Sequence, residues 1–199
     1  MHYSVIAIER EYASGGREVG EKLASALGVP FLNQQILKIA ADKLGQPADQ
    51  LSRTEESINS GLSLGFAALL NVASGESPSA MPVAQQLMLA ETRIIHDLAT
   101  QPCVIVGRAA AGILKDQRKT LTAFIHADQS ARAARAIETY DDNPRQVDAI
   151  LQRNDRRRSA YFAAATNLEW RNPDLYHLFL NSGRLGIDQT VEVLLAAVG

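Results

Sequence analysis

The sequence predicts an α/β fold, with a parallel sheet of about five strands and helices on both faces. Four short, continuous apolar runs indicate this sheet, because strands buried on both faces read as unbroken apolar segments. Segments of helical periodicity separate the runs, as the connections between parallel strands require. A chain of 199 residues with 46% hydrophobic and 21% charged residues is typical of one globular domain, so residues 1–199 are expected to form a single domain.

The first elements are expected in the order strand, helix, strand, helix. An apolar strand over Tyr3–Ile8, at the centre of the sheet, leads through a glycine-containing turn into a helix over Gly16–Leu27. Gly28 is a good stop for this helix, since glycine readily adopts the left-handed conformation of a C-cap. A shorter and weaker strand over Val29–Leu32 precedes a helix over Gln34–Leu44, which another glycine follows.

The segment 46–100 has no obvious strand and is expected to be a helical insertion. Residues 74–82 consist almost entirely of turn formers and small residues, which predicts a mobile loop. A long helix over Met81–Ala99 then leads into an apolar strand over Cys103–Val106.

The second half of the chain contains the remaining two apolar runs. They predict strands over Leu121–Ile125 and His177–Leu180. A helix from Arg145 to about Ala165 lies between them and carries the densest charge in the chain.

Composition excludes several classes of function. The formal net charge of −2 argues against nucleic-acid binding by bulk charge. Cys103 is the single cysteine, so no intrachain disulfide and no thiolate metal cluster can form, and its apolar surroundings predict a buried, inert thiol. No apolar run approaches the roughly 18 residues of a membrane span, and no signal peptide is recognised. We therefore expect a soluble, cytoplasmic protein without membrane or nucleic-acid partners.

The histidines are scattered and lack the spacing of metal ligands; they are His2, His96, His126 and His177.

The turn after the first strand is a candidate anion site. Backbone N–H groups at a helix N-terminus point outward, and the helix dipole favours negative charge. Gly15 and Gly16 permit a close approach of the backbone, and Ser14 is a candidate helix cap or magnesium contact. The usual phosphate-loop pattern G-x-x-x-x-G-K-[ST] is nevertheless absent.

Arginines indicate two further candidate anion-binding sites. Gly107 and Arg108 follow the Cys103–Val106 strand, at the sheet edge where α/β proteins bind ligands. Residues 153–158 contain four arginines within two helical turns, and Arg153 and Arg157 share a face by their four-residue spacing. A solvated charged face, or a local pair with Asp155, is the alternative to an anion site.

Four stretches together resemble the cytidylate kinase-like family, a divergent branch of the P-loop nucleoside monophosphate kinases. They are IAIEREYASGGREVGEKLASALGVPFLNQQIL, VIVGRAAAGIL, AFIHADQSARAARA and YHLFLNSGRLGIDQTVEVL. They occur in the expected order and cover most of the chain, with 46–100 the least distinctive part. The resemblance implies a P-loop kinase-type three-layer fold, ATP and Mg²⁺ as cofactors, and a small acceptor such as a CMP-like nucleoside monophosphate.

The resemblance also implies roles for individual residues. The opening turn would bind the donor phosphates together with lid-associated arginines; this set is Tyr12, Ala13, Ser14, Gly15, Gly16, Arg17, Glu18, Arg132 and Arg135. Ser14 would contact magnesium. The arginines expected to act in transfer are Arg17, Arg108, Arg153, Arg157 and Arg158, with Arg108 gripping the acceptor. Segment 46–100 would bind the monophosphate, and residues from about 143 to 165 would form a lid.

The chain departs from the pattern of ordinary monophosphate kinases at several positions. Gly16 occupies the place of the phosphate-loop lysine, and Arg17 or Glu18 stands where a hydroxyl normally holds magnesium. Asn33 and Ala109 replace acidic residues of the acceptor region, which weakens any assignment of cytosine as the base. We expect either that Arg17 supplies the missing cation or that it pairs with Glu21 on the helix surface.

Three classes of function stay open at this stage. The first is an active phosphotransferase, with its oligomeric state left open. The second is a catalytically impaired nucleotide-binding regulator or scaffold, and the third is an interaction protein that uses the scaffold without nucleotide.

Overall fold

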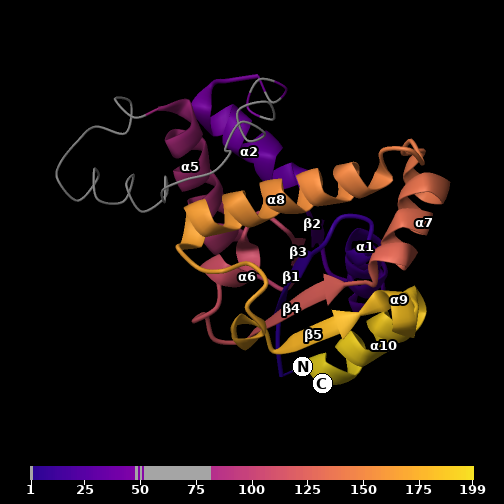
Figure 1. Cartoon of the computed structure of the whole chain (residues 1–199). Coiled ribbons are helices and arrows are strands. Elements are labelled where there is room, and N and C mark those ends of the chain that lie inside the picture. The colour runs from indigo at the N-terminus through magenta and orange to yellow at the C-terminus, as the bar shows by residue number, and fades with distance from the viewer. Residues whose placement is uncertain (1, 48, 50, 52–81) are drawn as a thin grey trace.

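The computed structural model describes residues 2–47, 49, 51 and 82–199 (Figure 1). Its sheet has five strands in the order β2-β3-β1-β4-β5, and every neighbouring pair is parallel. The strands are β1 (Val5–Arg10), β2 (Phe31–Leu32), β3 (Cys103–Val106), β4 (Thr120–His126) and β5 (Leu178–Asn181). The predicted parallel sheet, with the first strand at its centre, is confirmed.

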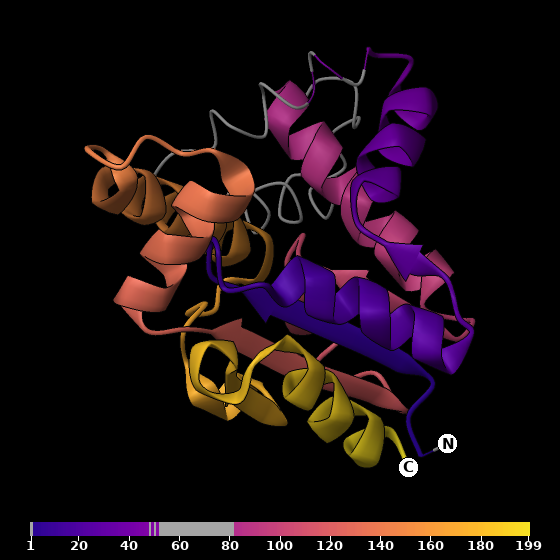
Figure 2. The ribbon, with the colours of Figure 1, turned by 90° about the vertical axis from the view of Figure 1, so that its right-hand side faces the viewer.

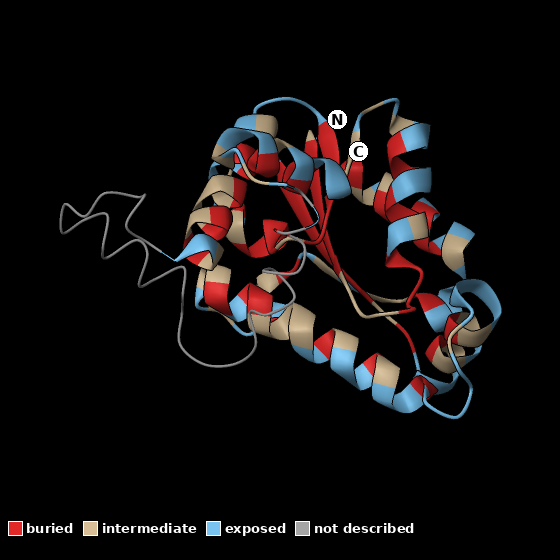
Figure 3. Ribbon diagram, turned by 90° about the horizontal axis from the view of Figure 1, so that it is seen from above, coloured by how far each residue is buried: buried red, intermediate tan, exposed pale blue. Residues whose placement is uncertain are grey.

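Helices cover both faces of the sheet. Those described are α1 (Gly16–Leu27), α2 (Gln34–Leu44), α5 (Val83–Leu98), α6 (Ala110–Ile113), α7 (Gln129–Tyr140), α8 (Val147–Thr166), α9 (Ser182–Leu185) and α10 (Ile187–Val198), with a 3-10 turn η2 (Pro173–Leu175). Figure 2 shows α1 and α10 side by side on one face, and the buried strands lie between helical layers in Figure 3. The three-layer α/β fold is therefore present.

Alternation along β1 divides the core into two clusters. Val5 and Ala7 pack with α2, α5, α6 and the C-terminal half of α8, whereas Ile6 and Ile8 pack with α1 and α10. Because successive side chains of a strand point to opposite faces, the last two residues of β1 also diverge. Glu9 points to the α6/α8 side of the sheet and Arg10 to the α1 side.

The predicted bounds of α1, α2 and β3 agree with the structure. The bounds Tyr3–Ile8 are wrong for β1, because its pairing with β4 begins at Val5 and continues through Arg10 opposite Ile125. The strand was predicted from its apolar run, so its last two residues, Glu9 and Arg10, were not included because their side chains are polar. The ladder likewise places β5 one residue later than His177–Leu180.

Other predictions differ from the structure or fall outside its described part. The helix after Arg145 begins at Val147 and ends at Thr166. Helices α7 and α10 were not predicted; α7 buries only Arg132 and Ala136, so no group of large apolar residues marks its buried face. Residues 74–81 and most of 46–82 lie outside the described residues, and α5, which packs on α2, is the described part of the expected insertion. Within the described ranges, no helix combines the length and apolarity that a bilayer crossing requires.

Candidate active site

A cavity of about 510 Å³ lies at the carboxyl ends of the central strands, beside the N-terminus of α1. Arg10 ends β1, Arg108 follows β3 by two residues, and Asn33 follows β2, so three strand ends contribute to its wall. Five of the lining residues are arginines: Arg10, Arg17, Arg108, Arg157 and Arg158. This is the edge at which open α/β sheets bind ligands.

The turn between β1 and α1 has the backbone conformation of an anion-binding nest. Ala13 (φ 57°) and Gly15 (φ 76°) are left-handed, and Gly15 is the N-cap of α1. Such alternation turns successive N–H groups toward one concave side. A side chain at Gly15 would be strained by its φ of 76°, and its Cβ would also displace Cδ1 of Ile187, which would lie 2.3 Å away. Tyr12, Ala13, Gly15 and Gly16 all line the cavity.

Ser14 faces the interior of the protein. Its hydroxyl donates to the Glu11 carbonyl at 2.9 Å, its own carbonyl accepts from the Ser182 hydroxyl, and its exposed fraction is 2%. Among the described residues, Ser14 is not part of the cavity wall. Its hydroxyl shapes the turn in this structure, and its role as a magnesium contact stays a prediction.

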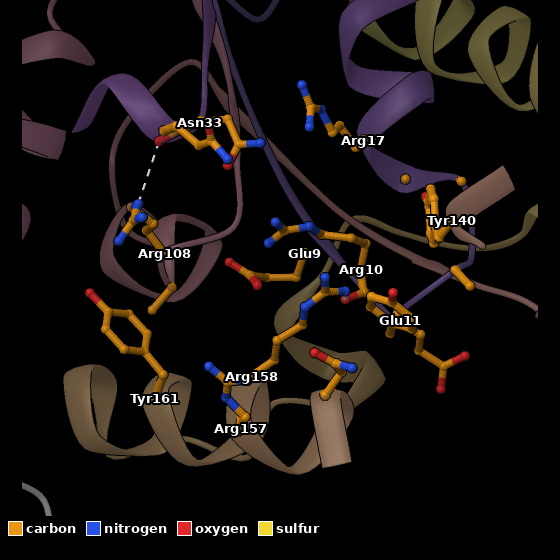
Figure 4. Close-up of a pocket in the computed structure, with 17 residues that line it drawn as sticks. Glu9, Arg10, Glu11, Arg17, Asn33, Arg108, Tyr140, Arg157, Arg158 and Tyr161 are labelled. Carbon is orange, nitrogen blue, oxygen red and sulfur yellow. Dashed lines mark hydrogen bonds between the residues drawn. The ribbon is translucent and has the colours of Figure 1, made fainter. Parts of the chain in front are cut away.

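Arg17 adopts the second of the two geometries expected for it. Its Nε donates to Oε1 of Glu21 at 2.9 Å, and both side chains are exposed. In Figure 4, Arg17 lies on the first turn of α1, apart from the arginines at the centre of the cavity. Its phosphate-binding role stays a prediction.

Arg10 is a site residue that sequence reasoning missed. A Cβ on Gly107 would lie 1.7 Å from Nη1 of Arg10, and one on Gly16 would lie 2.5 Å from Cβ of Arg10. The side chain therefore extends from the turn at Gly16 across to Gly107, along the wall of the cavity. Its position as the last residue of a central strand, directly before the turn, was the available signal.

Arg108 is fixed on the opposite wall by a buried carboxylate. Its Nη1 pairs with Oε1 of Glu91 at 2.5 Å, and Glu91 is 0% exposed. The Tyr161 hydroxyl donates to the other oxygen of Glu91, and Nε of Arg108 lies 3.4 Å from the Asn33 carbonyl. Arg108 and Tyr161 both line the cavity, so Glu91 holds two polar lining groups in place.

One face of α8 contributes Asn154, Arg157, Arg158 and Tyr161 to the cavity. Asn154 and Tyr161 each lie three or four residues from both arginines, which places the four side chains along one side of the helix. Nη1 of Arg158 donates to the Arg10 carbonyl at 2.9 Å. Arg153 is exposed and is not among the described lining residues, so the structure brings Arg157 and Arg158 to the cavity but not Arg153.

A buried ion-pair network supports the turn from beneath. Asp155 of α8 accepts from the backbone N–H of Tyr12 at 2.8 Å and pairs with Nη1 of Arg132 at 2.6 Å. Arg171 contacts Asp155 at 3.1 Å and Glu11 at 2.6 Å. Asp155 does pair with arginines, but the observed partners come from other segments, Arg132 on α7 and Arg171 after α8, and not from its own cluster as the sequence alternative expected.

The two lid-associated arginines and Glu18 make contacts outside the cavity wall. Arg132 is buried in the network of Asp155, and Arg135 pairs with Glu18 at 2.9 Å. None of the three is among the described lining residues. Their roles in phosphate binding stay predictions, and their observed contacts hold α7 against the turn and α1.

Glu9 is a buried carboxylate in the cavity wall. Its exposed fraction is 3%, and Oε2 accepts from Nε1 of Trp170 at 3.3 Å. Within the described part of the chain, Oε1 is buried and has no hydrogen-bond partner. Burial raises the pKa of the Glu9 carboxyl, although the charges of Arg10 and Arg158 oppose that rise.

Cys103 is buried, as predicted, and its lack of reactivity stays a prediction. Its side chain is 2% exposed, its Sγ lies 3.8 Å from the Leu98 carbonyl, and burial raises the pKa of the thiol to about 11. It lies in β3, remote from the cavity wall.

The cavity wall contains donors of the kind that bind phosphate groups. Guanidinium groups and backbone N–H groups are the donors that phosphate oxygens prefer. No cluster of three or more His, Cys, Asp or Glu side chains suited to a metal occurs among the described residues. Magnesium in kinases is held largely by substrate phosphates, with few protein ligands, so this donor set is compatible with a magnesium–nucleotide complex.

Comparisons with known proteins agree with this geometry. The sequence model described as the cytidylate kinase-like family matches residues 5–184. A crystal structure of an uncharacterized protein from Eubacterium ventriosum is similar, with a TM-score of 0.70 and 20% identity over 98% of this chain and 97% of the other.

Two named kinases share the fold at lower similarity. Shikimate kinase from Bacteroides thetaiotaomicron has a TM-score of 0.52 and 15% identity over 98% and 97% of the two chains. A gluconokinase from Sinorhizobium meliloti has a TM-score of 0.50 and 15% identity over 99% and 94%. No relative was found among curated proteins.

Proposed function

The chain belongs to the cytidylate kinase-like family, and on this premise we propose that it transfers the γ-phosphoryl group of ATP to a small acceptor. The acceptor is a nucleoside monophosphate or another small molecule. The observation that supports this proposal is the convergence of five arginines on one cavity beside a left-handed turn and a helix N-terminus. Phosphoryl transfer depends mainly on positioning and on neutralising developing charge, which this arrangement provides.

The donor phosphates would lie against the turn. Backbone N–H groups of residues 15–17 would bind them, since the N–H of Ser14 already donates to the Glu11 carbonyl, and Arg10 would supply the charge that the absent lysine supplies elsewhere. Mg²⁺, when bound with the nucleotide, would neutralise phosphate oxygens. The guanidinium of Arg10 can take the place of the lysine side chain. An anion-binding nest is formed by backbone N–H groups, so it depends on glycine and left-handed residues more than on lysine.

The acceptor would lie on the side of Arg108, Asn33 and Tyr161. Arg157 and Arg158 extend from α8 toward the space between donor and acceptor, where charge develops during transfer. We propose that α8, within the expected lid segment of about 143–165, closes over the reacting groups and excludes water.

A binding experiment tests the donor site. The dissociation constant of a non-hydrolysable ATP analogue with Mg²⁺ is measured calorimetrically for the wild type, Arg10→Ala, Arg157→Ala and Arg153→Ala. The first two variants should lose about 1.5–3 kcal/mol of binding free energy, or roughly 10- to 100-fold in affinity. Arg153→Ala is the matched control, because Arg153 lies on the same helix but outside the described cavity wall. Wild-type affinity in both Arg10→Ala and Arg157→Ala would refute the proposed site.

Arg17→Ala identifies the source of the loop cation. Loss of affinity in this variant would assign the cation to Arg17, whereas normal affinity would leave Arg10 in that role. The observed pairing of Arg17 with Glu21 favours the second result.

A nucleotide-binding regulator is the second candidate function. The missing lysine and the inward-facing Ser14 hydroxyl favour it. Product formation from ATP, Mg²⁺ and a panel of nucleoside monophosphates and other small acceptors separates the two, because a regulator would bind ATP without turnover.

A further inference from the structure

Glu9 is a carboxylate placed among the cationic groups of an anion site. Two phosphate groups brought together in this cavity would both be repelled by an ionised Glu9. The proposed binding of donor phosphates therefore gives no reason for an acidic residue at this position. Its presence calls for a ligand group that donates a hydrogen bond.

The position of Glu9 relates it to the acceptor. Alternation along β1 places Glu9 on the α6/α8 side of the sheet, whereas Cβ of Arg10 lies against Gly16 and its guanidinium extends to Gly107. Figure 4 shows the Glu9 carboxylate directed toward the side of the cavity where Arg108 and Tyr161 lie.

The two oxygens of the Glu9 carboxylate have different surroundings. Nε1 of Trp170 donates to Oε2, and the backbone N–H of Ala111 also interacts with the carboxylate. Oε1 is buried in the cavity wall and makes no hydrogen bond of normal geometry with the described residues. Buried acceptors are almost always satisfied, so an unsatisfied carboxylate oxygen at a ligand site points to a donor supplied by the ligand.

The chemical class of the phosphate acceptor determines which of its groups donates a hydrogen bond to Glu9. The nucleophilic oxygen of a phosphate monoester is already ionised near neutral pH, so it needs no base and offers Glu9 no proton. An alcohol must lose its proton as it attacks, and kinases that phosphorylate hydroxyl groups use a carboxylate to accept that proton. A carboxylate desolvated by its surroundings is also a stronger base than one in water.

We infer that Glu9 is the general base for a hydroxyl acceptor, and that the natural acceptor is a small alcohol which also carries an anionic group for Arg108. This inference rests on the proposed phosphotransferase function. The acceptor oxygen forms a bond to the γ-phosphorus of ATP, and the bond from that phosphorus to the β,γ-bridging oxygen breaks. ADP leaves with the electron pair of the broken bond, and the hydroxyl proton moves to Oε1 of Glu9 and then to solvent.

Glu9→Gln is the variant that tests the inference. The amide is isosteric with the carboxylic acid and can still accept the hydrogen bond of Trp170, so the fold is preserved. Transfer of ³²P from γ-labelled ATP is measured with glycerol 3-phosphate, D-glycerate and ribose 5-phosphate as alcohols, with water alone, and with CMP, UMP, AMP and GMP as phosphate acceptors. Glu138→Gln is the matched control, because it makes the same chemical change at an exposed carboxylate on α7.

The expected result has three parts. Label enters an alcohol or water rather than the phosphate of a nucleotide; Glu9→Gln slows that transfer by about 100-fold or more; and affinity for the ATP analogue stays within twofold. In the wild type, kcat/KM should rise with pH as Glu9 loses its proton, and this rise should be absent in Glu9→Gln. The other charged or titratable groups around Glu9 are Arg10 on β1, Arg158 on α8 and Tyr176 after α8, none of which changes charge near neutral pH.

Several results would overturn the inference while leaving the proposed function intact. They are transfer to the phosphate of a nucleotide, unchanged transfer in Glu9→Gln, a higher magnesium requirement in Glu9→Gln with an unchanged pH profile, or no transfer to any hydroxyl, water included, by a wild type that binds ATP. Failure of the wild type to bind the ATP analogue would instead refute the proposed function, and the inference with it.

Discussion

Replacing Asp155 by asparagine should destabilise the protein by about 3 kcal/mol. Asp155 is 6% exposed, and the substitution removes its charge next to Arg132, which is 8% exposed. Breaking a buried ion pair by removing one partner costs about 3–5 kcal/mol, because a buried charge is left behind. The lower end applies here, since Arg132 keeps Glu11 at 3.4 Å and Arg171 is half exposed to solvent.

The asparagine also preserves one contact of Asp155, so the cost of losing the charge can be measured apart from the cost of losing the hydrogen bond to Tyr12. Its carbonyl oxygen can still accept from the N–H of Tyr12, whereas Asp155→Ala loses this acceptor too and should cost roughly 1 kcal/mol more. Urea denaturation followed by Trp170 fluorescence measures both changes. In thermal unfolding, a loss of 3 kcal/mol should lower the Tm by roughly 6–12 °C for a chain of this size.

The control is the exposed pair of Arg17 and Glu21, whose side chains are 59% and 45% exposed. Glu21→Gln should change the unfolding free energy by no more than about 0.5 kcal/mol. A loss below about 1 kcal/mol in Asp155→Asn would show that the network under the turn contributes no more than a surface pair.

Three further predictions concern packing, reactivity and pH. Gly20→Ala should cost about 1–3 kcal/mol in urea unfolding, because its Cβ would lie 2.5 Å from Cγ2 of Val106 and would push α1 away from β3. Cys103 should resist iodoacetamide at pH 8 in the folded protein and react only after unfolding, as mass spectrometry would show, since burial raises its pKa to about 11. Glu9→Gln should raise the Tm relative to the wild type at pH 8 but not at pH 4. The folded state keeps the Glu9 proton above the ordinary pKa of 4.5, so wild-type stability falls as pH rises from that value through the raised pKa, and the amide removes this fall. An unchanged Tm difference between the two pH values would contradict this explanation.

Local signals were sufficient to predict much of the fold. The bounds of α1, α2 and β3 depend on caps and apolar runs that lie within the elements themselves. Helix α7 was missed because its buried face is made of an arginine and an alanine rather than of larger apolar residues.

The site was harder to predict because its contacts join distant segments. Asp155 meets the Tyr12 N–H across 143 positions of sequence, and Trp170 reaches Glu9 across 161. No local pattern distinguishes such partners from surface charges. The register of α8 was also undetermined, so Arg153 was grouped with Arg157 although only Arg157 reaches the cavity. Arg10 was overlooked because strand alternation was not continued past the apolar part of β1.

The central position of β1 has a consequence for biosynthesis. Its described strand partners are β3 and β4, which begin at Cys103 and Thr120. Ribosomes add roughly 5–20 residues per second, so on the order of ten seconds separate the emergence of β1 from that of both partners. During this interval the nascent chain presents an apolar segment with unpaired backbone groups, which is the kind of segment that aggregates or recruits chaperones. A ribosome stalled before Cys103 should therefore hold a nascent chain that binds a chaperone at residues 5–8, and release past His126 should end that binding.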